Sequence, residues 1–380
     1  MFLVICMIHL ASGRAQVSRL PQAKQMDDFL KAEMHTNGIP GLAFAIVQNG
    51  QLVYQRTFGK ANIEWDAPVD EHTVFQIASV TKLFTSTLVL KWVQDGKLRL
   101  DDPISQYFSD APAAWQHIQV KHLLSHQSGL PWPSGIGGFI GTKSSGSNTP
   151  PSREEIYRSI KDSAASFAPG TKESYINGDH FILQMILEKI AGKPFPEILQ
   201  EEVLSKLGMH DSGYDWEIRA LPMQVMKALP RKSQLFTKGK TAPNILKAFY
   251  NASSYDAAGL YLSISDAVKW AIALDRGSFI TKAMVDSFQA PMPLNGSFTK
   301  LGWIKEKMYG QITYGHSGGP GLGQILRIPE KKLTIIVLNN DADLYPYLGN
   351  ALLGIYLGAA EIKEKDLKTK TIDRGYEAYF

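Results

Sequence analysis

Ser79 and Lys82 stand three residues apart at the start of a helical pattern that runs to about Gln94. Positions three apart lie on one helix face, so the amine is expected one turn below the hydroxyl. A serine hydroxyl becomes an effective nucleophile only when a neighbouring group accepts its proton. Lysine can accept it when burial depresses its pKa from about 10.4. Apolar neighbours predict such burial: Phe75, Ile77, Leu83, Phe84 and Leu88. This pair indicates acyl transfer, with the Ser79 N–H at the helix start as one oxyanion donor.

A second candidate segment holds Tyr175 and Asn177, the only Tyr-x-Asn among the 15 tyrosines. It lies in a predicted loop ahead of a helix. A phenol close to lysine can act as base for the serine and then as acid for the leaving group. Asn177 would orient the lysine or bind a substrate carbonyl. Taken alone, the segment fits equally well a helix-capping Asn beside a half-buried Tyr.

The third candidate segment is His316-Ser317-Gly318-Gly319, at the end of a predicted strand. Glycines at a strand edge allow a substrate to approach the backbone closely. Gly319 would donate the second oxyanion hydrogen bond. A histidine hydrogen-bonded within a sheet is the ordinary alternative for His316.

The Ser-x-x-Lys spacing is not unique, since Ser297 and Lys300 repeat it. That copy follows the turn dipeptide Asn295-Gly296 and has no helical pattern behind it. We therefore interpret it as a chance match, and Ser79 as the nucleophile.

Strand patterns come from both ends of the chain, and helical patterns from its middle. Asn49-Gly50 separates the first two strands and is a strong hairpin signal. The terminal elements are helices at about 23–35 and 344–357, with strands at about 41–47, 52–58, 311–316, 323–328 and 333–339. The middle helices are expected at about 79–94, 154–161, 180–191 and 195–207. The predicted fold class is α+β, an antiparallel sheet built from both chain ends with flanking helices and an inserted, mainly helical domain.

The expected organisation has one hydrolase domain, residues 16–360, between two terminal segments. An apolar start at 2–11, with Gly13 and Ala15 before a cut ahead of Gln16, predicts a signal peptide and export. A misplaced start codon or a buried N-terminal segment is the alternative. The predicted parts are a signal peptide at 1–15, a sheet core at about 23–78 and 274–360, a helical region at about 79–273 and a charged tail at 361–380. The stretch 131–151 is predicted to be a long loop.

Composition excludes several classes of function. The chain has 380 residues, 44% hydrophobic and 20% charged, with a net charge of +4. No basic run alternates with aromatics, so we expect no nucleic-acid partner. No stretch is long enough for a membrane span. The one cysteine is Cys6, and His122 and His126, expected on one helix face, have no catalytic Glu between them. We expect neither a metal nor an organic cofactor.

Together, the three segments resemble the class C β-lactamase and D-Ala-D-Ala carboxypeptidase family of serine hydrolases. Further stretches resemble this family: residues 120–131, 167–170 and 207–209. The likeness covers about 41–339. It implies a site at the junction of sheet and helical domain, with Ser79 acylated and Lys82 and Tyr175 as its base system. It also implies that the Ser79 and Gly319 amides form the oxyanion hole. Asn177 and His316 would contact substrate or tune the base system, and Ser317 and Gly318 would belong to the substrate-binding and oxyanion segment.

One departure from the family pattern affects the expected substrate. The third motif begins with His316, and no Lys-Thr-Gly or Lys-Ser-Gly occurs in the chain. Histidine, with a pKa near 6.5, is mostly neutral at pH 7 and cannot replace the fixed charge of lysine. We therefore expect an esterase, amidase or peptidase acting on small acyl or D-amino-acid substrates. The alternatives are a D-Ala-D-Ala carboxypeptidase, penicillin-binding protein or weak β-lactamase, and a non-catalytic sensor. Activity is expected to rise as His316 or its neighbours titrate.

Overall fold

The computed structural model describes most of the chain between Leu20 and Ala359. The described residues are 20–131, 139–140, 152–215, 217–219, 225–246, 249–250, 252–288, 297–319, 322–344 and 347–359. The predicted signal peptide, the charged tail and nearly all of the 131–151 stretch lie outside them.

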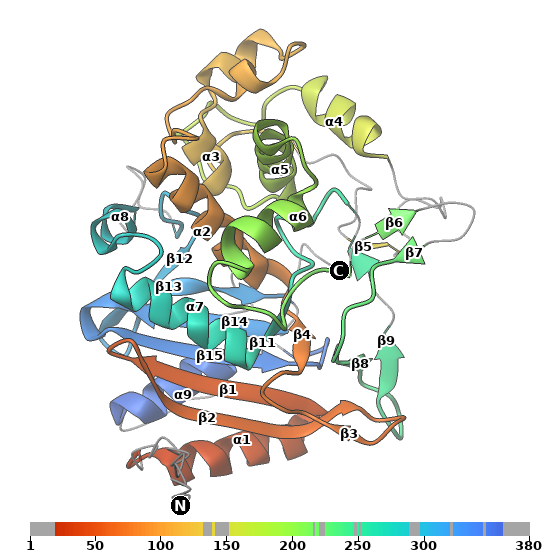
Figure 1. The fold of residues 1–380 in the computed structure, drawn as a ribbon, viewed down its shortest axis with the longest axis vertical. Helices are drawn as coiled ribbons and strands as arrows, with labels where there is room; N and C mark the ends of the chain where they lie inside the picture. Colours follow the sequence, from red (N-terminus) through yellow and green to blue (C-terminus); the bar gives the residue numbers. More distant parts are fainter. Residues whose placement is uncertain are drawn as a thin grey trace, which may run out of the picture.

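A seven-stranded antiparallel sheet joins the two ends of the chain (Figure 1). Its order is β12 (Ile304–Met308), β13 (Gln311–Gly318), β14 (Gly323–Ile328), β15 (Leu333–Asn339), β1 (Gly41–Gln48), β2 (Gln51–Asn62) and β3 (Ala67–Pro68). The central pairing sets Phe44 of β1 opposite Val337 of β15. A short 3-10 turn, Pro329–Lys331, connects β14 to β15.

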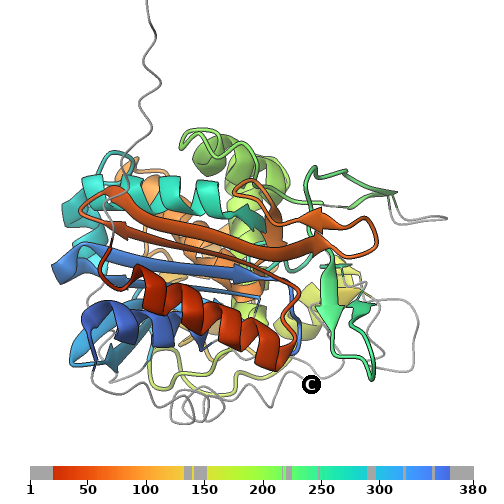
Figure 2. The same cartoon turned by 90° about the horizontal axis from the view of Figure 1, so that it is seen from below.

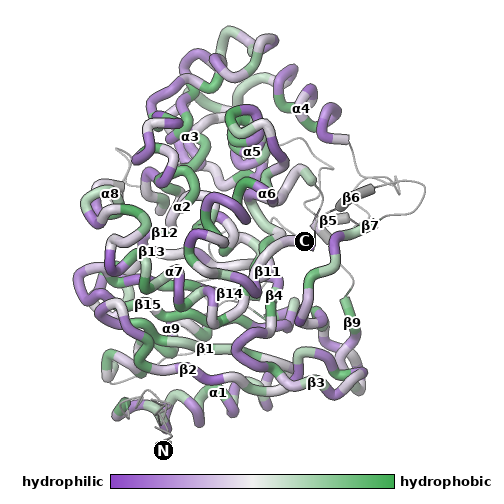
Figure 3. Tube along the Cα trace, viewed as in Figure 1, coloured by the Kyte–Doolittle hydropathy of each residue, from purple (hydrophilic) through white to green (hydrophobic). Residues whose placement is uncertain are grey.

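The sheet is covered on both faces. Helices α1 (Ala23–Asn37) and α9 (Leu348–Leu357) lie side by side on one face, and α7 (Ile264–Arg276) packs on β1 and β15 from the other (Figure 2). Side chains alternate along β1, so Phe44 packs towards α1 and α9 while Ala43 and Ala45 belong to the other core. Figure 3 shows the resulting hydrophobic concentration along β1 and β15.

The helical half lies above the sheet in Figure 1. It contains α2 (Thr81–Gln94), α3 (Val120–Leu124), α4 (Arg153–Lys161), α5 (Asn177–Ala191) and α6 (Phe195–Leu199), with α8 (Lys282–Phe288) beside α7 and α2. Single turns are η1 (Ala78–Val80), η2 (Ile104–Tyr107), η3 (Ala113–His117) and a π turn, η4 (Gln200–Leu204). The described residues also form four short strand pairs: β4 (Val74–Gln76) with β11 (Tyr261–Ser263), β5 (Phe139–Ile140) with β10 (Phe249–Tyr250), β6 (Glu217–Arg219) with β7 (Val225–Met226), and β8 (Leu235–Thr237) with β9 (Asn244–Leu246).

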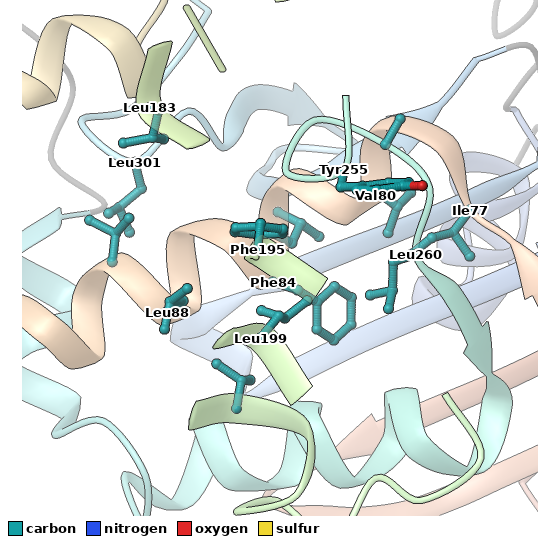
Figure 4. Packing of buried hydrophobic residues seen from close by; sticks show 14 of the residues in the cluster. Ile77, Val80, Phe84, Leu88, Leu183, Phe195, Leu199, Tyr255, Leu260 and Leu301 are labelled. Atoms are coloured by element: carbon teal, nitrogen blue, oxygen red, sulfur yellow. The ribbon is translucent and has the colours of Figure 1, made fainter. Parts of the chain in front are cut away.

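Helix α2 is the central helix of the molecule. Its first ten residues are all buried, which confirms the predicted burial. Figure 4 shows Phe84 and Leu88 of α2 packed near Phe195 and Leu199 of α6. Its buried hydroxyl groups take part in hydrogen bonds: Trp303 Nε1 donates to Ser86 Oγ at 2.6 Å, for example. A helix enclosed in this way can hold a lysine in a dry environment.

The predicted fold class is confirmed, but several local predictions are wrong. Helix α9 begins at Leu348, not near 344, and helix α6 stops at Leu199 before a π turn. The middle of the chain also contains short strands that we did not predict. Helix α7, which contains residue 273, packs on β1 and β15.

Candidate active site

Ser79 lies on a sharply turned segment between β4 and α2. Of residues 73–90, all of which the structure describes, only Ser79 is not buried. The preceding residue, Ala78, has φ +44°, a strained value for a residue with a Cβ. The turn is anchored by a hydrogen bond from Ile77 N–H to Leu260 O at 3.2 Å. The turn therefore presents the Ser79 hydroxyl at the start of a buried helix.

Lys82 lies one turn into the buried segment, with 2% of its surface exposed. Its Nζ donates to Ser79 Oγ at 3.2 Å, to Ala257 O at 3.0 Å and, more weakly, to Asn177 Oδ1 at 3.4 Å. Burial lowers the Lys82 pKa to about 7, while the nearby Asp256 acts to raise it. An amine with this pKa is about half neutral at pH 7 and can accept a proton.

Tyr175 contacts the same hydroxyl from the other side. Its OH donates to Ser79 Oγ at 2.9 Å, and Lys82 Nζ lies 5.1 Å from its ring centroid. The loop before it is anchored by Ser174 N, which donates to His126 O at 2.9 Å. The predicted segments holding Ser79, Lys82, Tyr175 and Asn177 therefore meet within hydrogen-bond distance.

An aromatic wall surrounds Tyr175. Its ring centroid lies 4.5 Å from that of His126 and 5.6 Å from that of Phe298, which is nearly parallel at 11°. Phe298 comes from the Ser297–Lys300 segment, which as predicted has no helix behind it. Both Ser297 N and Phe298 N donate to the Glu173 carboxylate, at 3.1 and 3.2 Å. Sequence reasoning missed Phe298, since nothing local shows that this segment is held against the Tyr175 loop.

Strand β13 passes directly beside the Ser79 turn. A Cβ on Gly318 would lie 2.2 Å from Ile77 O and 3.2 Å from Ala78 Cβ. Gly318 itself pairs with Gly323 of β14. Only glycine permits this approach, so the backbone of β13 lies directly against the turn that carries Ser79.

Gly318→Ala is expected to lower kcat/KM about 100-fold, because the added methyl forces the β13 edge away from the Ser79 turn. Overpacking should also lower the free energy of unfolding by about 1–3 kcal/mol. The matched control is Gly310→Ala in the turn before β13, where φ is +74° but nothing lies within 4 Å of the new Cβ. This control should lose stability without losing kcat/KM. Equal activities of the two variants would contradict the steric argument.

His316 is buried, with 3% of its surface exposed, and lies in β13 opposite Ile325. Its Nδ1 donates to Ser317 O at 2.7 Å, which leaves Nε2 as the unprotonated nitrogen of the neutral ring. Burial and the nearby Lys82 amine lower the His316 pKa to about 3. His316 is therefore neutral from pH 5 to 9, so of the two expected sources of a pH-dependent rise, His316 or a neighbour, the pKa values favour a neighbour. The neighbour that titrates in this range is Lys82.

Two buried histidine–carboxylate pairs lie behind the site, and sequence reasoning missed both. His126 Nδ1 lies 3.2 Å from Asp179 Oδ2, and His180 Nδ1 lies 2.9 Å from Asp256 Oδ2. All four side chains are at most 1% exposed. Burial raises the pKa of both carboxyl groups well above the ordinary range and lowers the pKa of both histidines.

The expected shared helix face of His122 and His126 is wrong. Helix α3 ends at Leu124, and His126 follows it with φ +56°. His122 instead accepts from Gln119 N at 3.1 Å as part of a capping box. Within the described ranges, no three His, Cys, Asp or Glu side chains are grouped as a metal would require.

A family model described as Beta-lactamase matches residues 26–354. The chain belongs to the β-lactamase family. It is 25% identical over 360 residues to the N-acetylmuramyl-L-alanine amidase of Bacillus subtilis (strain 168), covering 83% of this chain and 80% of that protein. It is 24% identical over 341 residues to the D-alanyl-D-alanine-carboxypeptidase/endopeptidase AmpH of Escherichia coli (strain K12), covering 82% of each.

A solved structure shows the same fold. The octameric penicillin-binding protein homologue from Pyrococcus abyssi has a TM-score of 0.73 and 26% identity, covering 88% of this chain and 77% of that one. The resemblance inferred from the sequence is confirmed. The protein is a serine hydrolase of the β-lactamase family, and the alternative of a non-catalytic sensor is not retained. Among its described helices, none has the length and apolar character to cross a bilayer.

Proposed function

We propose that Ser79 is acylated by substrate, with Lys82 and Tyr175 as the groups that move its proton. The observation that carries this is the pair of contacts on one partly exposed hydroxyl, Lys82 Nζ at 3.2 Å and Tyr175 OH at 2.9 Å. Ser79 Oγ attacks the substrate carbonyl carbon, and its proton passes through these two groups to the leaving alcohol or amine. Water then attacks the acyl-enzyme by the reverse route. Asn177 holds Lys82 in place and borders the substrate.

The oxyanion of the tetrahedral intermediate would be bound between the Ser79 turn and the end of β13. We assign the Ser79 and Gly319 backbone N–H groups as its donors, supported by the close packing of Gly318 on Ile77. Ser317 and His316, next to these glycines in β13, would line the acyl donor.

The substrate class follows from the charge at β13. His316 is buried, neutral and within 6.0 Å of the Tyr175 ring, centroid to centroid. A neutral imidazole gives no fixed positive charge for a substrate carboxylate. We therefore propose an esterase, amidase or peptidase acting on small acyl or D-amino-acid substrates. The names of the relatives favour a second candidate, a D-Ala-D-Ala carboxypeptidase or penicillin-binding enzyme, with weak β-lactamase activity included.

The two candidates can be separated with the protein from residue 16 onwards. Hydrolysis of p-nitrophenyl butyrate and of an acyl-D-Ala-D-Ala peptide would be measured, with the intact mass recorded after a penicillin pulse. We expect ester turnover without a lasting penicillin adduct. A stable adduct on Ser79 with little ester turnover would instead support the cell-wall peptidase.

Localisation and domain division are also proposals. The apolar start at 2–11, followed by Gly13 and Ala15, supports cleavage before Gln16 and export. One hydrolase domain at 16–360, with a tail at 361–380, agrees with a family match that ends at residue 354.

A further inference from the structure

Lys82 donates a hydrogen bond to the backbone carbonyl of Ala257, and the residue before Ala257 is anchored by several contacts. Ala257 O accepts from Lys82 Nζ at 3.0 Å. The residue before it, Asp256, is fixed through its backbone: its O accepts from Thr85 Oγ1 at 2.6 Å and its N donates to Gln184 Oε1 at 3.2 Å. Helices α2 and α5 therefore both fix the position of this carbonyl.

The Asp256 side chain is anchored as well. It is fully buried, and its Oδ2 lies 2.9 Å from His180 Nδ1. Its other oxygen, Oδ1, has no hydrogen-bond partner among the described residues. A hydrogen bond from the Ala257 backbone also acts on this carboxyl and favours its charged form, so the side chain holds the residue whose carbonyl accepts from Lys82.

Helix α5 connects this pair to the catalytic groups. Asn177, which accepts from Lys82, and His180, which contacts Asp256, are three residues apart and lie on one face of its first turn. The same turn carries Asp179, whose partner His126 packs on Tyr175 instead. The two histidine–carboxylate pairs thus lie behind different members of the proton-transfer system.

We propose that His180 and Asp256 are a positioning pair for Lys82, which fixes the Ala257 carbonyl beneath its amine and places an acidic side chain behind it. This inference rests on the proposed roles of Ser79 and Lys82. Asp256 is the group that acts against burial to raise the Lys82 pKa. The other titratable or charged groups around this cluster are Tyr175, Asp179, His126, His316, Glu188, Arg153 and Tyr214.

The test compares Asp256→Asn with Asp179→Asn, a matched change at the other buried pair. The readout is the pH profile of kcat/KM for p-nitrophenyl butyrate, which for the unaltered protein should rise through about pH 7. Asparagine lacks the carboxyl group that acts to raise the Lys82 pKa, so Lys82 should lose its proton more readily and the midpoint should move down by about one pH unit. Asp179→Asn should leave the midpoint in place, whatever it does to kcat.

Three results would overturn the inference: an unmoved midpoint in Asp256→Asn, a move to higher pH, or an equal move in Asp179→Asn. If Asp256→Asn does not fold, His180→Gln decides. Without its histidine partner the Asp256 carboxyl holds its proton more tightly, so the midpoint should again fall, and an unmoved midpoint overturns the inference. Failure of the proposed function is recognised separately, because turnover would then survive Ser79→Ala.

Discussion

Ser79→Ala is expected to lower kcat/KM for p-nitrophenyl butyrate by at least about 10⁴-fold while leaving the fold intact. The substitution removes the atom that would carry the acyl group. Lys82 keeps its hydrogen bond to Ala257 O, so no buried amine is left without a partner. Because Ser79 is partly exposed, the free energy of unfolding should change by no more than about 1 kcal/mol. Steady-state kinetics together with chemical denaturation measure both effects.

The chain provides an internal control for this experiment. Ser297 has the same spacing to a lysine, but its side chain is exposed and no helix follows it. Ser297→Ala should therefore keep the activity of the unaltered protein. Full turnover in folded Ser79→Ala would end the acyl-enzyme proposal. Loss of turnover in Ser297→Ala would indicate that the nucleophile is Ser297 instead of Ser79.

The sequence predicts some elements to the residue. Strands β14 and β15 run from 323 to 328 and from 333 to 339, as expected, because each is an apolar-rich run and a Pro-Glu-Lys-Lys turn separates the two. The segments of Ser79, Tyr175 and His316 are also recognisable, since each has a short motif beside a periodic element. The family resemblance predicts that these three segments lie together in space, which their spacing in the sequence alone does not predict.

The rest depends on contacts between residues far apart in the chain. Strand β4 pairs with β11, about 190 residues later, and three residues are too few to give a periodic signal. His180 meets Asp256 across 76 residues, and neither residue stands in a motif. Their burial could be inferred only once α5 and the segment before β11 were placed against α2. The lowered pKa values of Lys82 and His316 follow from that same burial, so the magnitude of these shifts could not be predicted from the sequence.

Lys82→Met is expected to lower kcat/KM by about 10³-fold and to abolish the rise of activity through about pH 7. The amine accepts a proton only when it is neutral, so activity in the unaltered protein should increase as pH rises through the Lys82 pKa. His316, with a pKa of about 3, contributes no change between pH 5 and 9. Methionine has a similar length without a charge, which preserves packing in the buried helix. The measurement is the pH profile of kcat/KM over this range, with Lys300→Met as the control.

The same substitution should make the protein more stable. Lys82 has a folded-state pKa near 7 and an ordinary value of 10.5, so at pH 7 and above the unfolded chain binds more protons than the folded chain. Burying this lysine therefore costs stability, and that cost shrinks as pH rises towards 10.5. Lys82→Met removes the cost but also the hydrogen bonds to Ser79 and Ala257, for a net gain on the order of 2 kcal/mol at pH 7. An inactive variant that is more stable than the unaltered protein separates a catalytic role for Lys82 from a structural one. An inactive variant that is also less stable would show that Lys82 acts mainly in holding α2 against Ala257.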